Sequence, residues 1–145
     1  NIIKQREIKP IETTFELVDI INSSVPVKNK MDKSSVKRVF QAIRIEVNGE
    51  LNGLKETLFD IISSLNKGGR FAVLTFHSLE DRIVKNVFKQ ESTGCLCDKR
   101  LPICVCGHKK SVELVNKKPI VASQKEMEEN TRSRSAKLRV VEKLF

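Results

Sequence analysis

The sequence predicts an α/β fold, and three observations in its middle part support this. Residues 50–66 carry leucine and isoleucine at helical spacing, and a glycine pair at Gly68 and Gly69 follows them. The apolar run at 71–76 is rich in β-branched and aromatic residues, which is typical of a buried strand. Apolar residues return at helical spacing after a polar cluster at 77–81. Helix, turn, strand and helix in this order form half of a βαβ unit.

The polar cluster that joins this strand to the next helix is the first candidate for a site. Ser78 and Asp81 have the spacing of a capping box, in which the hydroxyl accepts a first-turn amide and the carboxylate reaches back. The junction follows the carboxyl end of a strand, which is where open α/β sheets bind ligands. The alternative is structural: His77 bridges strand and helix, Ser78 caps the helix, and Glu80 and Asp81 complement the helix dipole.

Two further helices are predicted before residue 50. Thr13 and Glu16 have a capping-box spacing that opens the first, and a polar linker at 27–33 follows it. The apolar side of this helix consists of Phe15, Leu17, Val18 and Ile21. The next helix begins near Ser34, and its apolar stripe at i, i+3, i+4, i+7 and i+11 predicts a core-facing side. The members of the stripe are Val36, Val39, Phe40, Ile43 and Val47.

A polar stripe on the same helix consists of Gln41, Arg44 and Asn48. It has two interpretations. Charged and polar side chains at helical spacing usually form a solvated face or bind a neighbouring helix. The functional interpretation is that this stripe borders a cleft for RNA or a cofactor.

The segment 91–108 has no periodicity and holds all four cysteines of the chain. Cys95, Cys97, Cys104 and Cys106 have the pattern C-x-C-x6-C-x-C, with His108 close behind. Four thiolates could form a tetrahedral zinc site that holds together a loop without a core of its own. The pairs are tighter than the usual C-x2-C, so reduced free thiols are an equal alternative and disulfides a third.

The carboxyl-terminal part predicts a short strand at 118–123, a short helix at 124–130 and a final, partly exposed strand at 136–141. The densest basic run of the chain lies around the start of this last strand: Arg132, Arg134, Lys137 and Arg139. These side chains contact RNA phosphates in one interpretation. In the other they protect an edge strand from aggregation.

Charge and composition narrow the possible partners. The net charge is +9, and residues 70–145 hold 16 basic and 9 acidic side chains against 11 and 9 in residues 1–69. Such a surplus favours a polyanion, although a solvated basic surface has the same charge. The chain has no Trp or Tyr, which argues against a base-stacking module.

Apolar patterning excludes a membrane span, because the longest apolar runs are about six residues. No signal peptide is recognised at the start, so we expect a cytoplasmic protein. The first residue is Asn rather than Met, and it opens within an apparent helical pattern. We therefore expect the chain to be a fragment.

Three segments resemble the MraW (RsmH) family of bacterial methyltransferases. They are F-H-S-L-E-D-R-x-V-K at 76–85, R-x-F-Q-A-I-R-I-E-V-N at 38–48 and N-T-R-S-R-S-A-K-L-R at 130–139, in family order. The resemblance covers nearly the whole chain but only the carboxyl-terminal portion of the family's sequence. Thr131 and Ser133 replace the family's usual Pro and Ala, which predicts a looser turn that keeps both arginines.

The resemblance implies a partial Rossmann-like class I methyltransferase sheet, with helices of the family's helical insertion before its C-terminal strands. Residues 1–33 would belong to the insertion and 34–145 to the methyltransferase domain, with a Cys-rich loop at 90–117. The parent protein would transfer a methyl group from S-adenosyl-L-methionine to the exocyclic amine of a cytosine in 16S rRNA of the small ribosomal subunit. The six glycines form no G-x-G-x-x-G loop, so we expect this fragment alone to lack cofactor binding and activity.

The resemblance also favours functional roles for the residues singled out above. The predicted catalytic residues are His77, Ser78, Glu80 and Asp81, and His77 is suited to accept a proton. The predicted RNA-binding residues are Arg44, Arg82, Arg132, Arg134, Lys137 and Arg139. The cysteines would have no catalytic role, because other family members lack the loop.

Two hypotheses from other classes compete with the enzyme. A non-enzymatic RNA-binding module would keep the basic surface and a zinc-stapled loop, and an α/β interaction domain would need neither. Extending the reading frame upstream discriminates among them, because a Gly-rich turn followed by an acidic residue would indicate a cofactor site.

Overall fold

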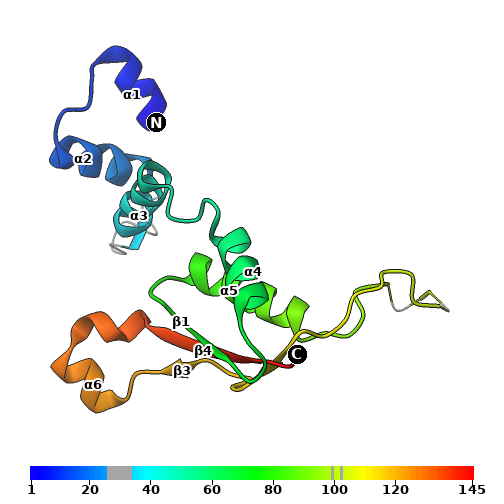
Figure 1. Ribbon diagram of the computed structural model, residues 1–145. Coiled ribbons are helices and arrows are strands. Elements are labelled where there is room, and N and C mark those ends of the chain that lie inside the picture. Colours follow the sequence, from blue (N-terminus) through cyan, green and yellow to red (C-terminus); the bar gives the residue numbers. More distant parts are fainter. Residues whose placement is uncertain (26–33, 99, 102) are drawn as a thin grey trace. The chain divides into compact units, whose positions relative to one another are not determined.

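The computed structural model describes residues 1–25, 34–98, 100–101 and 103–145 and divides into two compact units (Figure 1). The first unit is Asn1–Glu50 and the second is Leu51–Phe145. The division falls after Glu50. The predicted domain bounds of 1–33 and 34–145 stay a prediction. The predicted linker at 27–33 lies outside the described residues. The assignment of residues 1–33 to a helical insertion stays a prediction.

The first unit contains α1 (Ile2–Ile8), α2 (Thr14–Ser24) and α3 (Ser34–Asn48). The capping box predicted for α2 is confirmed. The Glu16 amide donates to Thr13 Oγ1 at 3.2 Å, and Glu16 Oε2 accepts from the Thr13 amide at 3.2 Å. Two orphan amides of the helix start are thereby satisfied.

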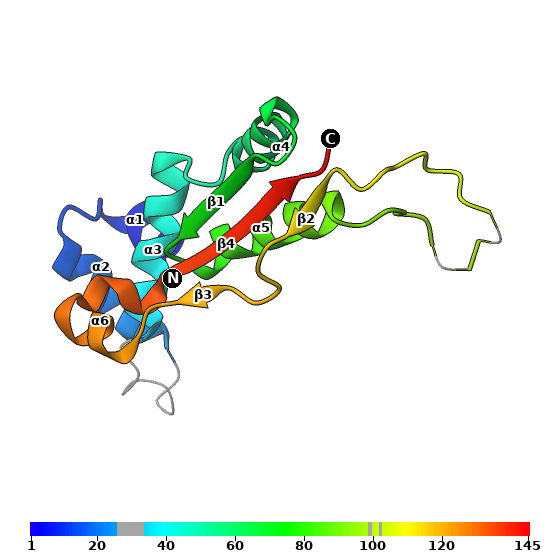
Figure 2. The same cartoon turned by 60° about the horizontal axis from the view of Figure 1, so that its bottom comes forward.

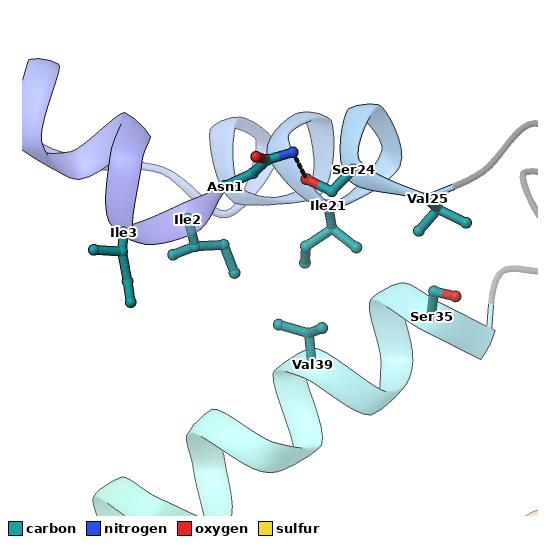
Figure 3. A pocket seen from close by; sticks show the side chains of 8 residues that line it. All are labelled: Asn1, Ile2, Ile3, Ile21, Ser24, Val25, Ser35 and Val39. Atoms are coloured by element: carbon teal, nitrogen blue, oxygen red, sulfur yellow. Dashed lines mark hydrogen bonds between the residues drawn. The ribbon is translucent and has the colours of Figure 1, made fainter.

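Apolar side chains of all three helices line an open groove in this unit. Ile2, Ile21 and Val39 come from three different helices, and an Asn1–Ser24 hydrogen bond of 2.8 Å joins α1 to α2 (Figure 3). Ile21 and Ile45 are the buried apolar residues of the unit among those described.

The apolar stripes predicted for α2 and α3 are therefore only partly confirmed. Phe15, predicted on the apolar side of α2, is 81% exposed, and Val47, predicted in the core-facing stripe of α3, is 79% exposed. Helical periodicity identifies the apolar side of a helix, but it does not show whether another element covers the whole of that side.

The described part of the second unit contains a four-stranded antiparallel sheet. Its strands are β1 (Arg70–Thr75), β2 (Val112–Leu114), β3 (Ile120–Val121) and β4 (Lys137–Lys143). β4 pairs with β1 on one side and with β2 and β3 on the other (Figure 2). Because β1 and β2 are each antiparallel to β4, they run parallel to one another, with β4 between them.

Two sequence predictions about these strands need correction. β4 was considered as a possible edge strand, but it has neighbours on both sides, so the edge-protection role for its basic residues is wrong. β1 was expected to be buried, but its residues alternate between less and more exposed, and Leu74 is 53% exposed. Helices of this unit therefore cover only one of its two faces.

The helical elements of the second unit are α4 (Leu54–Ser64), α5 (Ser78–Glu91), α6 (Gln124–Glu129) and the 3-10 helix η2 (Thr131–Ser135). α4 begins later than predicted because Gly53, at φ +70°, is its N-cap and not an interior residue. The predicted glycine stop is wrong, because α4 ends at Ser64 with Leu65 in extended backbone as its C-cap. Gly68, at φ +77°, lies instead in the turn before β1, and its amide donates to the Lys143 carbonyl at 2.8 Å. Left-handed backbone of this kind favours glycine.

The core of the second unit lies between the two longer helices and one face of the sheet. α5 contributes its largest buried side chain, Phe88, whose ring meets Phe71 of β1 edge-on at 5.8 Å. Full burial of one such side chain stabilises the fold by about 1.5–3 kcal/mol. The buried cluster consists of Leu58, Ile62, Val84, Val87, Phe88, Val112 and Val141. None of the described helices is long and apolar enough to cross a membrane.

Candidate functional site at the end of the first strand

The turn between β1 and α5 forms a capping box, but at a different register from the predicted one. His77, with extended backbone, is the N-cap, and its Nδ1 accepts the Glu80 amide at 3.3 Å. Glu80 Oε2 accepts the amides of Phe76 at 3.0 Å and His77 at 3.2 Å. The predicted Ser78–Asp81 box is therefore wrong. The three-residue spacing fits both pairs, and the end of β1 decides which residue precedes the helix.

This register leaves Asp81 free to bind β4. The Arg139 guanidinium donates from Nε to Asp81 Oδ1 at 2.7 Å and from Nη2 to Oδ2 at 3.2 Å. Lys137 Nζ lies 3.3 Å from Asp81 Oδ2. The Asp81 residue is only 7% exposed. Hydrogen bonding to Arg139 lowers the pKa of the Asp81 carboxyl below its usual value. Burial acts in the opposite direction on this pKa, but its effect is smaller.

A second contact joins β1 to β4 at the same end of the sheet. The buried Thr75 side chain donates from Oγ1 to the Lys137 carbonyl at 3.3 Å. Thr75 and Lys137 are also paired in the β1–β4 register. The end of β1, the start of α5 and the start of β4 are therefore fixed to one another.

The basic turn before β4 lies at this end of the sheet. Because β4 begins opposite the end of β1, η2 and the His77 turn are at the same end (Figure 2). The Ser133 hydroxyl, in a residue 6% exposed, donates to the Asn130 carbonyl at 2.7 Å. Ser133 therefore ties the turn together instead of loosening it. The arginines on either side of it, Arg132 and Arg134, are exposed and form no ion pair with any residue that the structure describes.

The remaining predicted RNA-binding arginines belong to two other elements, α5 and α3. Arg82 is exposed on α5. Arg44 belongs to the first unit, where its Nε and Nη2 bind the Glu50 carboxylate at 2.8 and 3.0 Å, and Asn48 binds the same group at 3.0 Å. Two members of the predicted polar stripe thus secure the end of α3. The RNA contacts predicted for all of these residues stay predictions.

The four cysteines come together in the loop between α5 and β2, and their Sγ atoms all lie within 4.8 Å of one another. Cys104 Sγ is 3.4 Å from Cys95, 3.9 Å from Cys97 and 3.6 Å from Cys106, and the Cys95–Cys106 distance is 3.9 Å. None of these pairs is at disulfide distance. This group could hold a metal ion.

The thiols of the cluster have unequal acidity. Hydrogen bonds from the backbone amides of Leu96 and His108 lower the pKa of Cys106 to about 6. The Cys97 amide favours the Cys95 thiolate, but hydrogen bonds with the Cys104 and Cys97 thiols outweigh it and raise the pKa of Cys95 to about 12. Cys106 is therefore a stronger acid than Cys95 within the cluster.

Comparison with known proteins decides the family. The sequence model of the MraW methylase family matches residues 1–144. The chain belongs to the MraW methylase family. This confirms the resemblance of the three segments. The predicted catalytic residues of this MraW family chain gather at one end of its sheet, next to two exposed arginines.

Curated relatives carry the name ribosomal RNA small subunit methyltransferase H. The chain is 56% identical over 143 residues to the one from Caldicellulosiruptor saccharolyticus, 52% over 143 residues to the one from Carboxydothermus hydrogenoformans and 50% over 146 residues to the one from Finegoldia magna. In each case 99% of this chain matches 46–47% of the relative. The chain therefore spans about half the length of the curated relatives it matches.

Sequence reasoning missed the partner of Asp81. Lys137 and Arg139 are two positions apart on a strand, so the sequence predicted that they share one face. Nothing in the sequence links that face to the helix that carries Asp81, 56 residues before Lys137. It also missed Asn116, whose Nδ2 donates to the Leu138 carbonyl at 3.0 Å while Oδ1 accepts the Val140 amide at 2.7 Å. The Asn116 side-chain amide thus takes the place of a strand partner for β4, in the gap between the stretches of β4 that pair with β2 and with β3.

Proposed function

We propose that this chain is the carboxyl-terminal part of an S-adenosyl-L-methionine-dependent methyltransferase that modifies the exocyclic amine of a cytosine in 16S rRNA of the small ribosomal subunit, in the cytoplasm. Its membership of the MraW methylase family and the names of its relatives support this. The observation that carries the proposal is that the F-H-S-L-E-D segment and the R-S-R turn lie at the same end of the sheet, where Asp81 binds Arg139 of β4.

The sheet suits the last strands of a Rossmann-like class I methyltransferase domain. β1 and β2 run parallel, and α5 lies on the chain between them, which is the βαβ relation of such sheets. Ligands of these sheets bind beyond the carboxyl ends of the parallel strands. The turn after β1 is such a position.

Methyl transfer to an aromatic amine requires donor and acceptor to be held in line and a proton to be removed from the amine. His77 and Glu80 shape the strand end through their mutual cap, and the exposed Ser78 side chain lies between them in the sequence, in the first turn of α5. Asp81 binds two cations of β4, so we assign it a positioning role. The chain has no G-x-G-x-x-G loop, so the rest of the parent protein would bind S-adenosyl-L-methionine, and this chain alone would not.

Arg132 and Arg134 are the best-placed residues for the RNA backbone, because they are exposed, lack ion pairs among the described residues and flank the strand end. Arg82 supplies a third exposed guanidinium from α5. Lys137 and Arg139 neutralise Asp81, and Arg44 binds Glu50, so any contact of these three with RNA would compete with an existing ion pair.

Nucleoside analysis tests the proposed reaction. The full-length protein would be incubated with unmethylated small ribosomal subunits and S-adenosyl-L-methionine labelled in its methyl group, and the 16S rRNA would then be digested to nucleosides. We expect label in N4-methylcytidine. Label on a ring carbon, in another base or only in protein would contradict the proposal.

A second candidate function is a non-enzymatic RNA-binding module. The presence of both the basic turn and the four-cysteine cluster within this chain favours it. It predicts that the 145-residue chain binds 16S rRNA as tightly as the full-length protein, and that the full-length protein transfers no methyl group. Methyl transfer by the full-length protein excludes this candidate.

A further inference from the structure

We propose that Cys95, Cys97, Cys104 and Cys106 bind one Zn²⁺ ion as a tetrahedral thiolate site. Tetrahedral geometry with Zn–S bonds of about 2.3 Å places neighbouring sulfurs about 3.8 Å apart. The four Sγ–Sγ distances given above, 3.4, 3.6, 3.9 and 3.9 Å, lie around this value. The other two Sγ–Sγ distances, Cys95–Cys97 and Cys97–Cys106, are at most 4.8 Å. Four sulfurs this close together form a donor set that suits zinc.

Backbone amides surround the cluster in the manner that thiolates require. The Leu96 amide donates to Cys106 Sγ and the Val105 amide donates to Cys97 Sγ, each at 3.4 Å. Each bond joins the two arms of the loop, residues 95–98 and residues 103–106, because the amide is on one arm and the sulfur on the other. A Zn²⁺ ion with four thiolates has a net charge of −2, and these amides disperse part of it. Zinc binding releases to solvent the protons of those cysteines that are still thiols at the pH of the experiment.

Sulfur is also the group that holds the two arms of this loop together. Among the described residues, each hydrogen bond between the arms at 95–98 and 103–106 has a cysteine Sγ as donor or acceptor. The apolar side chains of the loop do not pack together: Ile103 is 73% exposed and Val105 is 77% exposed. Four neutral thiols contribute too little to order such a loop, whereas a structural zinc ion provides much of the folding free energy of small domains.

The base of the loop is fixed without sulfur. The Ser111 amide donates to the Glu91 carbonyl at 2.9 Å, and their side chains form a further hydrogen bond. His108 Nε2 lies 3.0 Å from the Gln90 carbonyl, so this histidine belongs to the base and not to the cluster. Loss of zinc should therefore loosen the loop but leave α5, β2 and the rest of the sheet folded. This site is independent of the proposed methyltransferase activity.

Metal analysis of the 145-residue chain and the full-length protein, both purified without chelator, tests the proposal. We expect about one zinc per chain, no iron, and four titratable thiols only after chelation under denaturing conditions. Cobalt added to the chelated protein should give the intense d–d and sulfur-to-metal charge-transfer absorption of a tetrahedral thiolate site, saturating at one equivalent.

Variants identify the ligands. Cys97→Ser and Cys104→Ser each remove one thiolate from a different arm, and we expect zinc content to fall at least about tenfold after dialysis. His108→Ala is the matched control and should keep its zinc. Trypsin should cleave after Arg100 faster in the cysteine variants than in the control, while far-ultraviolet circular dichroism shows that the sheet and helices persist.

The outcomes are distinct. A metal-free protein with four reactive thiols, one with two disulfides, or one that contains iron would overturn the zinc assignment. Full zinc retention in both cysteine variants would overturn the four-ligand set. Zinc loss in His108→Ala would show that the histidine is a ligand and contradict the tetrathiolate site.

Discussion

The Arg139 guanidinium binds the Asp81 carboxylate through Nε at 2.7 Å and Nη2 at 3.2 Å, and it joins the first turn of α5 to the central strand of the sheet. Both side chains are 11% exposed, so the pair is largely withdrawn from water. The contact holds the F-H-S-L-E-D-R segment, which contains Asp81, against β4, the last strand of the chain. It also explains why two stretches far apart in the sequence form one structural unit.

Removal of this carboxylate should destabilise the second unit. We expect Asp81→Ala to lower the free energy of unfolding by about 3 kcal/mol, because it leaves the Arg139 guanidinium buried and unpaired. Arg70→Ala is the matched control, since the Arg70–Glu142 pair joins β1 and β4 at 2.8 Å but is largely exposed. Its loss should cost less than about 1 kcal/mol. Urea denaturation at neutral pH measures both, and equal effects would contradict the structural role of Asp81.

The stabilisation by Asp81 should depend on pH in a defined direction. The pKa of its carboxyl is lowered in the folded protein, chiefly by hydrogen bonding to Arg139. The contribution is therefore complete above the unfolded-state pKa of about 3.9 and is lost as the pH falls through the lower folded-state pKa. The difference in unfolding free energy between the wild type and Asp81→Asn should shrink below about pH 4. A difference that stays constant from neutral pH into this range would contradict the ion pair.

The register of the helix cap gives a third prediction. Glu80→Ala removes the acceptor of two backbone amides and should cost about 1–2 kcal/mol of unfolding free energy. Ser78→Ala should change it by less than about 0.5 kcal/mol, because Ser78 is the exposed first residue of the helix and not its cap. Thermal or urea unfolding of the two variants compares them. A larger loss of unfolding free energy in Ser78→Ala than in Glu80→Ala would contradict the His77–Glu80 cap and support the Ser78–Asp81 box.

Local signals in the sequence identified most of the second unit. The turn at Gly68, the strand at 70–75 and the helix after it follow from periodicity and turn chemistry, which act between near neighbours. β2 was missed because its three residues become a strand only by pairing with β4. The central position of β4 was missed for the same reason, since neighbours in a sheet come from distant segments.

The site was predictable as a set of residues but not as a set of contacts. The cluster at 77–81 and the basic run at 132–139 were both singled out, and the structure joins them through Asp81. Ring nitrogens are uncommon cap acceptors, so the hydroxyl of Ser78 was the stronger signal and led to the wrong register. Pairing of Asp81 with Arg139 depends on how α5 crosses the sheet, which no local pattern encodes.

The central claim is that the end of the sheet that carries His77 and the η2 turn faces ribosomal RNA, and the salt dependence of binding tests it most directly. The full-length protein with Arg132→Ala and Arg134→Ala would be titrated against small ribosomal subunits at several salt concentrations, with Lys125→Ala on α6 as control. We expect the double variant to bind at least about tenfold more weakly, with a salt slope smaller by about 2, and the control to bind like the wild type. An unchanged affinity and slope in the double variant would contradict the claim.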